Sequence, residues 1–134
     1  RIGYAYGSET LISTLEAVKN SYNSYTMDSL ALAVGEASVR DEDYFRETCR
    51  KVMATRDRAA DELRALGFEV TPSLTNFLFA THPSKKAPEI FAALREKGIF
   101  IRYFKLPRID NHLRITVGTD EQMDALIAAL KQIL

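Results

Sequence analysis

Residues 98–119, GIFIRYFKLPRIDNHLRITVGT, contain the pattern that decides the fold of this chain. Two apolar runs, residues 99–105 and 113–118, flank a segment at 107–111 that contains Pro, Asp and Asn. Apolar runs separated by turn-forming residues predict two strands joined as a hairpin. The segment is therefore expected to form two neighbouring antiparallel strands.

Two arginines inside these runs, Arg102 and Arg114, are the candidate binding residues. If the turn is centred on Arg108, they lie directly opposite each other on one face of the sheet. Like charges in that position destabilise a sheet. An anion bound between the two arginines would offset their repulsion, and the planar guanidinium suits a carboxylate or a phosphate. Two plainer interpretations stay open: each arginine reaches solvent, or each pairs with a nearby Asp or Glu. A shift of the register by one residue would put them on opposite faces.

Helices are predicted on both sides of this hairpin. Thr119 and Gln122 form a capping box ahead of a C-terminal helix, and Pro88 and Gly98 bracket a shorter helix. Upstream, apolar residues at steps of three and four predict a long helix at about 42–66, before a glycine that stops it.

Short strands are expected at 68–70 and 76–80, where the helical spacing of apolar residues is lost. The predicted fold class is α/β, in the form of an α+β small domain. Its small mixed sheet of about 3–4 strands has helices packed on it, including the long one.

The N-terminal part differs in pattern from the rest. Residues 1–7 alternate large and small side chains, which predicts a strand, and Ser8 is a good N-cap for a helix that runs to about residue 20. An Ala-rich helix is expected at 28–38. A strand at the first residue suggests a piece of a longer protein, although a removed tag or start residue would leave the same pattern. We expect 1–25 to lead from a preceding large domain and 26–134 to form a C-terminal small domain.

Composition narrows the possible functions. The chain has 134 residues with zero formal net charge, which argues against a sequence-independent nucleic-acid binder. The single cysteine, Cys49, cannot form an internal disulfide, so a reducing cytoplasm is expected. No apolar run is long enough for a membrane span, and His82 and His112 lack neighbours at metal-ligand spacing. We expect no metal site, no membrane contact and no nucleic-acid partner.

Several segments resemble fold-type I pyridoxal-phosphate-dependent aminotransferases. The run 113–119, LRITVGT, resembles their carboxylate-binding segment, in the form found in histidinol-phosphate aminotransferases. The resemblance extends in order along the whole chain, through the segments RIGY at 1–4, VKNSYNSY at 18–25, TNF at 75–77 and GIFIR at 98–102. The run around Arg114 is the most specific of these; the others are individually weaker.

The resemblance implies roles for individual residues. The residue matching Arg114 binds the α-carboxylate of the amino-acid substrate, typically glutamate, and the residue matching Arg102 belongs to the site for the phosphate of histidinol phosphate. The residue matching Arg1 contacts the phosphate of pyridoxal phosphate, whereas the role of Asn76 cannot be assigned. One arginine pair could thus serve two unlike substrates in turn, as ping-pong transamination requires.

The Schiff-base lysine of such enzymes lies upstream of the position that matches Arg1. We therefore expect no catalytic residue in this chain, no transaminase activity and no bound pyridoxal phosphate in the chain alone, although the longer parent would be an aminotransferase of histidine biosynthesis.

Two alternatives remain. The chain could be the small domain of a related enzyme, such as an aromatic aminotransferase or a threonine-phosphate decarboxylase, or a stand-alone anion-binding regulatory domain. Without its large domain, apolar residues of 1–25 would be exposed, so we expect a homodimer.

Overall fold

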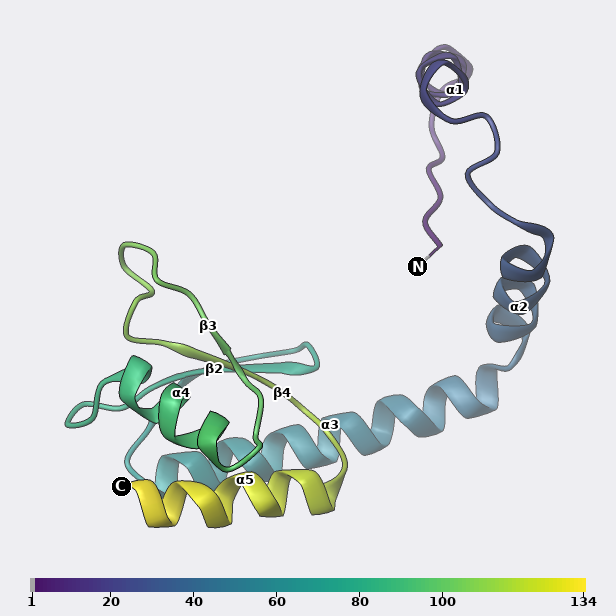
Figure 1. Cartoon of the computed structure of the whole chain (residues 1–134). Coiled ribbons are helices and arrows are strands. Elements are labelled where there is room, and N and C mark those ends of the chain that lie inside the picture. Colours follow the sequence, from purple (N-terminus) through teal and green to yellow (C-terminus); the bar gives the residue numbers. More distant parts are fainter. Residues whose placement is uncertain (1) are drawn as a thin grey trace. The chain divides into compact units, whose positions relative to one another are not determined.

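A computed structural model describes residues 2–134 and shows helices and strands in two compact units (Figure 1). The first unit ends at Arg46, and the second is Glu47–Leu134. In chain order the elements are α1 (Glu9–Tyr22), α2 (Ser29–Arg40), α3 (Glu42–Ala65), β1 (Glu69–Thr71), β2 (Phe77–Thr81), α4 (Ala87–Glu96), β3 (Arg102–Tyr103), β4 (Leu113–Thr116) and α5 (Asp120–Ile133).

The second unit contains a four-stranded sheet in the order β1-β2-β4-β3. The predicted α/β fold class is confirmed, but every hydrogen-bonded strand pair is antiparallel, so the expectation of a mixed sheet was wrong. The reason lies in the connection of β2 to β3 through α4. These two strands run parallel to each other, and β4 inserts between them, which leaves no parallel neighbours.

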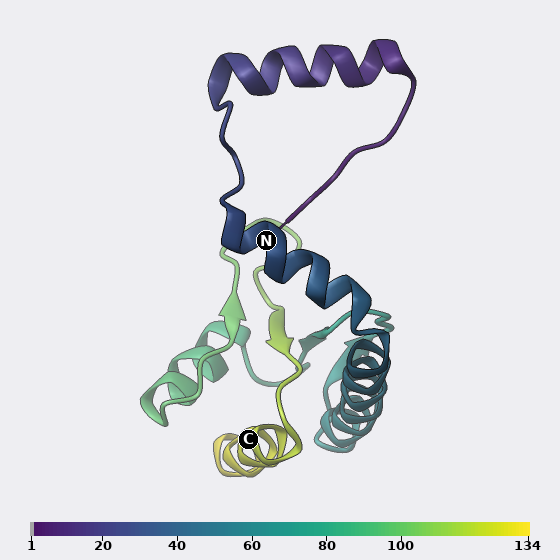
Figure 2. The ribbon, with the colours of Figure 1, turned by 90° about the vertical axis from the view of Figure 1, so that its right-hand side faces the viewer.

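Helices of the second unit lie on one face of this sheet. Figures 1 and 2 show α4, α5 and the C-terminal part of α3 on the same side of the strands. Alternate strand residues on that side, such as Leu78, Leu113 and Ile115, are buried in the core. Successive strand residues point to opposite faces, so the other face carries Phe77, Phe79, Arg102, Arg114 and Thr116, and we call it the open face.

Two glycines end helices as predicted, and the strands that follow them begin later than predicted. Gly67 has a φ of 89° and Gly98 a φ of 75°, the left-handed conformation that glycine adopts without strain. The next residue in each case, Phe68 or Ile99, donates its backbone N–H to a carbonyl in the last turn of the helix, at 3.0 and 2.9 Å. Those N–H groups are therefore not available to the sheet, and β1 and β3 begin later than the apolar runs suggested.

An ion-pair network joins α3 to the start of α5. The Arg58 guanidinium lies 2.9 Å from Asp120, 2.6 Å from Asp124 and 2.8 Å from Glu62. Hydrogen bonds from Arg58 and from the Thr55 hydroxyl hold the pKa of the Asp120 carboxyl below its ordinary value. The predicted capping box of α5 is present next to this network.

The first unit has no buried residue on α1 or α2. Ser8 caps α1 as predicted, through a hydrogen bond from the backbone N–H of Leu11. The strand predicted at 1–7 was wrong for the described residues: 2–7 form no regular structure, because a strand requires a hydrogen-bonded neighbour that these residues lack among 2–134. Leu11, Leu15 and Val18 are exposed in this unit.

Candidate anion-binding site

Arg102 and Arg114 are direct partners in the β3–β4 pair, so the predicted register is confirmed. The two guanidinium groups extend from the same face, since partners across an antiparallel pair point the same way. Arg114 is half-buried and Arg102 is exposed. The hairpin reverses through residues 104–112, where Arg108 has a φ of 71°.

Aromatic rings surround the Arg114 guanidinium. Its Cζ lies 4.5 Å from the centre of the Phe77 ring and 5.5 Å from that of Phe104. The Arg102 Cζ lies 5.4 Å from the same Phe104 ring, so both arginines contact this ring. Cation–π contacts of this kind attract a guanidinium to the ring face and help to hold it in place.

Neither arginine of this pair has a hydrogen bond or an ion pair within residues 2–134, and the Nε of Arg114 is buried without a partner. This contrasts with Arg56, which is also largely buried but bonds Asp57 and the Thr75 carbonyl. A half-buried guanidinium without a counter-ion is suited to an anion from outside the chain. The exposed Arg102 equally fits the interpretation that it is solvated.

Asn111 anchors the segment that enters β4. Its side-chain oxygen accepts from the backbone N–H of Ala87, and its amide nitrogen donates to the Thr81 hydroxyl. The next residue, His112, stacks on Phe79 with ring centres 4.7 Å apart. These contacts fix the backbone two residues before Arg114, at the start of the strand that carries it.

The aromatic members of the site were not predicted from the sequence. Phe77 and Phe79 were expected only as part of an apolar strand, and His112 was considered only as a metal ligand. Phe77 and Phe79 are two residues apart in the sequence, which places both rings on one face of a strand. Only the pairing of Phe79 with Arg114 shows that this is the face of the arginines.

Other predicted residues lie elsewhere or have limited roles. Arg1, the predicted cofactor contact, lies outside the described residues. Asn76 accepts a backbone hydrogen bond from Val117, which extends the β2–β4 pair. Cys49 is partly buried on α3, and no cluster of metal-ligating side chains occurs in residues 2–134.

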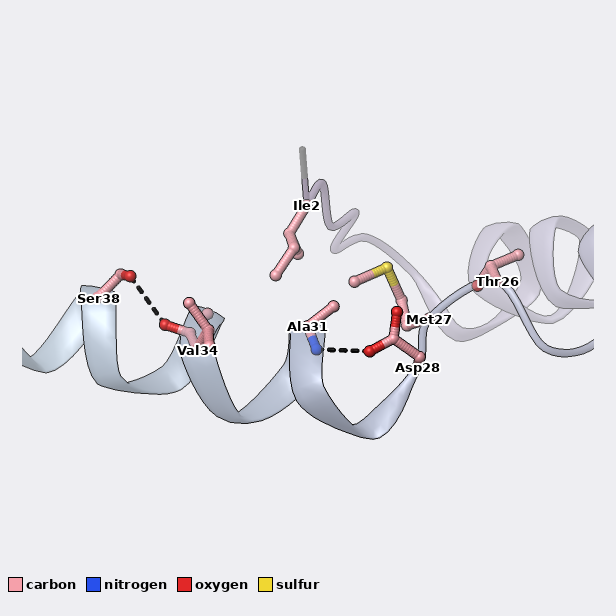
Figure 3. Close-up of a pocket in the computed structure, with 8 residues that line it drawn as sticks. Ile2, Thr26, Met27, Asp28, Ala31, Val34 and Ser38 are labelled. Carbon is pink, nitrogen blue, oxygen red and sulfur yellow. Dashed lines mark hydrogen bonds between the residues drawn. The ribbon is translucent and has the colours of Figure 1, made fainter.

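A hollow in the first unit is unsuited to an anion (Figure 3). Its lining is largely apolar, with Ile2 facing the helix α2 near Ala31 and Val34. The charged residue in this lining, Asp28, is acidic and caps α2 through the backbone N–H of Ala31. In the part of the chain that the structure describes, this hollow therefore offers no basic group to a carboxylate or a phosphate, whereas the open face offers two.

The fold agrees with the comparisons with known proteins. The family model "Aminotransferase class I and II" matches residues 1–130, and the chain belongs to this family. A histidinol-phosphate aminotransferase from Marinomonas sp. is 54% identical over 133 residues, which are 98% of this chain and 38% of that relative. The chain therefore spans less than half the length of the curated relatives it matches.

Two solved structures of aminotransferases have a fold similar to that of this chain. The histidinol-phosphate aminotransferase of Sinorhizobium meliloti, in complex with pyridoxal-5'-phosphate, has a TM-score of 0.81 at 30% identity and matches 90% of this chain and 34% of its own. A putative aminotransferase of Burkholderia pseudomallei has a TM-score of 0.79 at 31% identity and matches 95% of this chain and 38% of its own. No helix within residues 2–134 has the length and apolar character needed to cross a membrane.

The described residues do not form a place for pyridoxal phosphate by themselves. A Schiff base needs a lysine held at the cofactor. The lysines of this chain are exposed apart from Lys85, which is half-buried and donates to the backbone carbonyl of Ile133. None of them is a strand residue of the open face beside Arg102 and Arg114.

Proposed function

We propose that this chain supplies the anion-binding surface of a pyridoxal-phosphate-dependent aminotransferase that acts on histidinol phosphate and 2-oxoglutarate. The observation that carries the proposal is the unpaired, aromatic-walled Arg114 with Arg102 as its direct strand partner. The names of relatives that are 50–55% identical support the choice of substrate. The cofactor and its lysine would belong to the part of the longer protein that this chain does not contain.

In this proposal the two arginines have different tasks. Arg114 binds the α-carboxylate of glutamate or 2-oxoglutarate, since a half-buried guanidinium held between rings presents a fixed, planar fork to a planar carboxylate. Arg102 is more exposed and binds the phosphate of histidinol phosphate. Binding of this phosphate depends less on a fixed orientation of the guanidinium. Pyridoxal phosphate, when bound to the longer protein, would supply the electron sink for transfer of the amino group.

Calorimetric titration of the chain tests these tasks directly. We expect Arg114→Ala to weaken glutamate binding by about tenfold or more, and Arg102→Ala to weaken histidinol phosphate binding by about tenfold, since hydrogen bonds to charged groups contribute about 1.5–3 kcal/mol. Arg95→Ala on α4, which removes an exposed arginine away from the open face, is the matched control. If both arginine variants bind both ligands as well as the unmodified chain, the assignment is wrong.

We further propose that the chain alone has no transaminase activity. A coupled glutamate and 2-oxoglutarate assay with added pyridoxal phosphate should give no turnover above that of the free cofactor. Turnover that depends on the chain would contradict the proposal that the catalytic lysine belongs to another part of the protein.

We also propose that the chain associates as a homodimer and works in the cytoplasm. The proposed dimer is supported by the apolar surface of α1, where Leu11, Leu15 and Val18 are at least 53% exposed. Apolar surface of this kind favours association. Light scattering at high concentration should give a mass above the 15.1 kDa of one chain; a mass equal to it would count against the dimer.

A further inference from the structure

His112 extends the open face beyond the two arginines. It lies two residues before Arg114, and its ring stacks on Phe79 with an interplanar angle of 6°. Phe79 is in turn the direct strand partner of Arg114. Because its ring stacks on Phe79, whose side chain is on the open face beside Arg114, His112 lies on that face as well.

The ring nitrogens of His112 are not equivalent. Nδ1 is buried and has no hydrogen-bond partner, so Nε2 is the nitrogen that a ligand can reach. A buried N–H without an acceptor is rarer in native structures than an under-used acceptor, which favours the tautomer with the proton on Nε2. The charged ring also carries a proton there. In either state Nε2 is a hydrogen-bond donor beside Arg114.

Charged groups around His112 favour an anionic ligand. Arg114 and Arg102 lie on the same face, and Arg108 and Asp110 belong to the preceding turn. The acidic residue in the described strands of this face is Glu69, the partner of Thr81 on β1, at the far edge of the sheet. Glu69 is two strand spacings from His112, or about 10 Å. Solvent and salt therefore weaken the repulsion between the Glu69 carboxylate and an anion bound at His112.

We propose that His112 is a specificity-determining residue that makes the open face prefer a terminal phosphate to a carboxylate. This inference rests on the proposed anion-binding function. A phosphate offers three acceptor oxygens, which match three donor residues, Arg114, Arg102 and His112. A carboxylate has only two oxygens, and a bidentate arginine binds both of them in its own plane. The Nε2–H bond is therefore expected to form with the third oxygen of a phosphate, which a carboxylate lacks.

Nitrogen NMR on the full chain tests this, because its two histidines give separable ring signals. The probes are inorganic phosphate and acetate at one fixed pH. Phosphate should shift the Nε2 signal of His112, and acetate should not. His82 is the internal control: its Nδ1 accepts from the backbone of Lys85, and its Nε2 lies 3.2 Å from the Leu66 carbonyl. A response of both histidines, or of neither, would overturn the proposal.

Variants separate a binding role from a structural one. His112→Phe keeps the stack on Phe79 and removes the donor, so phosphate affinity should fall about tenfold while acetate affinity changes less than about twofold. His112→Gln, which places an N–H donor near the position of Nε2, should restore most of the affinity. Ser73→Ala, which removes a hydroxyl in the loop before β2, should change neither ligand.

Outcomes distinguish this inference from the function on which it rests. If Arg114→Ala weakens acetate binding and Arg102→Ala weakens phosphate binding but His112→Phe changes neither, the proposed function stands and the role of His112 is wrong. Equal loss of both anions in His112→Phe also contradicts it. If Arg114→Ala leaves both anions bound, the proposed function itself is wrong. If the chain binds neither anion, its open face does not discriminate between them, and the proposal fails.

Discussion

The two faces of the small sheet are made from alternate residues of the same strands, yet they do different things. Leu113 and Ile115 of β4 are almost fully buried against the helices, while Arg114 between them is half-buried without a hydrogen-bond partner. A strand with one packed face and one free face can change its binding residues without disturbing its core. The contrast separates residues that fold the domain from residues that we propose bind its ligand.

The largest expected effect comes from the packed face. Leu113→Ala should lower the free energy of unfolding by about 3 kcal/mol, because it removes a side chain that is 1% exposed and leaves a cavity. Urea denaturation measures the change. Arg114→Ala, one residue along the same strand, is the control and should cost less than about 1 kcal/mol. Equal losses would mean that the two faces are not separable.

A smaller effect is expected for the aromatic ring beneath Arg114. Phe77→Leu removes the cation–π contact at 4.5 Å and should weaken acetate binding by about threefold, since such contacts contribute roughly 0.5–1 kcal/mol at exposed sites. Phe77→Tyr should restore the affinity because it restores the ring. If Leu and Tyr bind acetate equally well, the ring does not position the guanidinium.

The features predicted from the sequence are those fixed by local chemistry. The stop at Gly67, the cap at Ser8 and the capping box at Thr119 each depend on residues within a few positions of one another. The pairing of Arg102 with Arg114 is also local, because the two strands are joined by a single reversal of the chain.

What could not be predicted depends on contacts between distant segments. Phe77 reaches Arg114 only because β4 pairs with β2 across the intervening α4 and β3, and the sequence contains no signal for that register. The wrong strand at 1–7 has the same cause: large and small residues alternated, but a strand also needs a neighbour. The antiparallel sheet was not predicted because the sequence does not show that β4 lies between β2 and β3.

The helix side of the sheet offers a test by pH. Arg58 and Thr55 hold the pKa of Asp120 below its ordinary value of 3.8. A carboxyl with a lowered pKa in the folded state contributes stability above its unfolded pKa and loses it as the pH falls through the folded value. The unfolding free energy should therefore decrease below about pH 4, and Asp120→Asn should make that decrease shallower. An unchanged slope would mean that other carboxylates account for the loss; Glu36→Gln, on exposed α2, is the control.

The smallest expected effect concerns the turn that decides which face each arginine occupies. Arg108 has a φ of 71°, a conformation that costs a residue other than glycine about 1 kcal/mol or more and that asparagine tolerates better. Arg108→Asn should raise the free energy of unfolding by about 0.5 kcal/mol and leave acetate and phosphate affinities unchanged, because the register of Arg102 with Arg114 is kept. Arg108→Val is the matched opposite, since a β-branched side chain is poorly tolerated at positive φ. If Arg108→Asn instead reduced anion binding, Arg108 would itself be part of the open face. The turn would then contribute a binding residue as well as setting the fold.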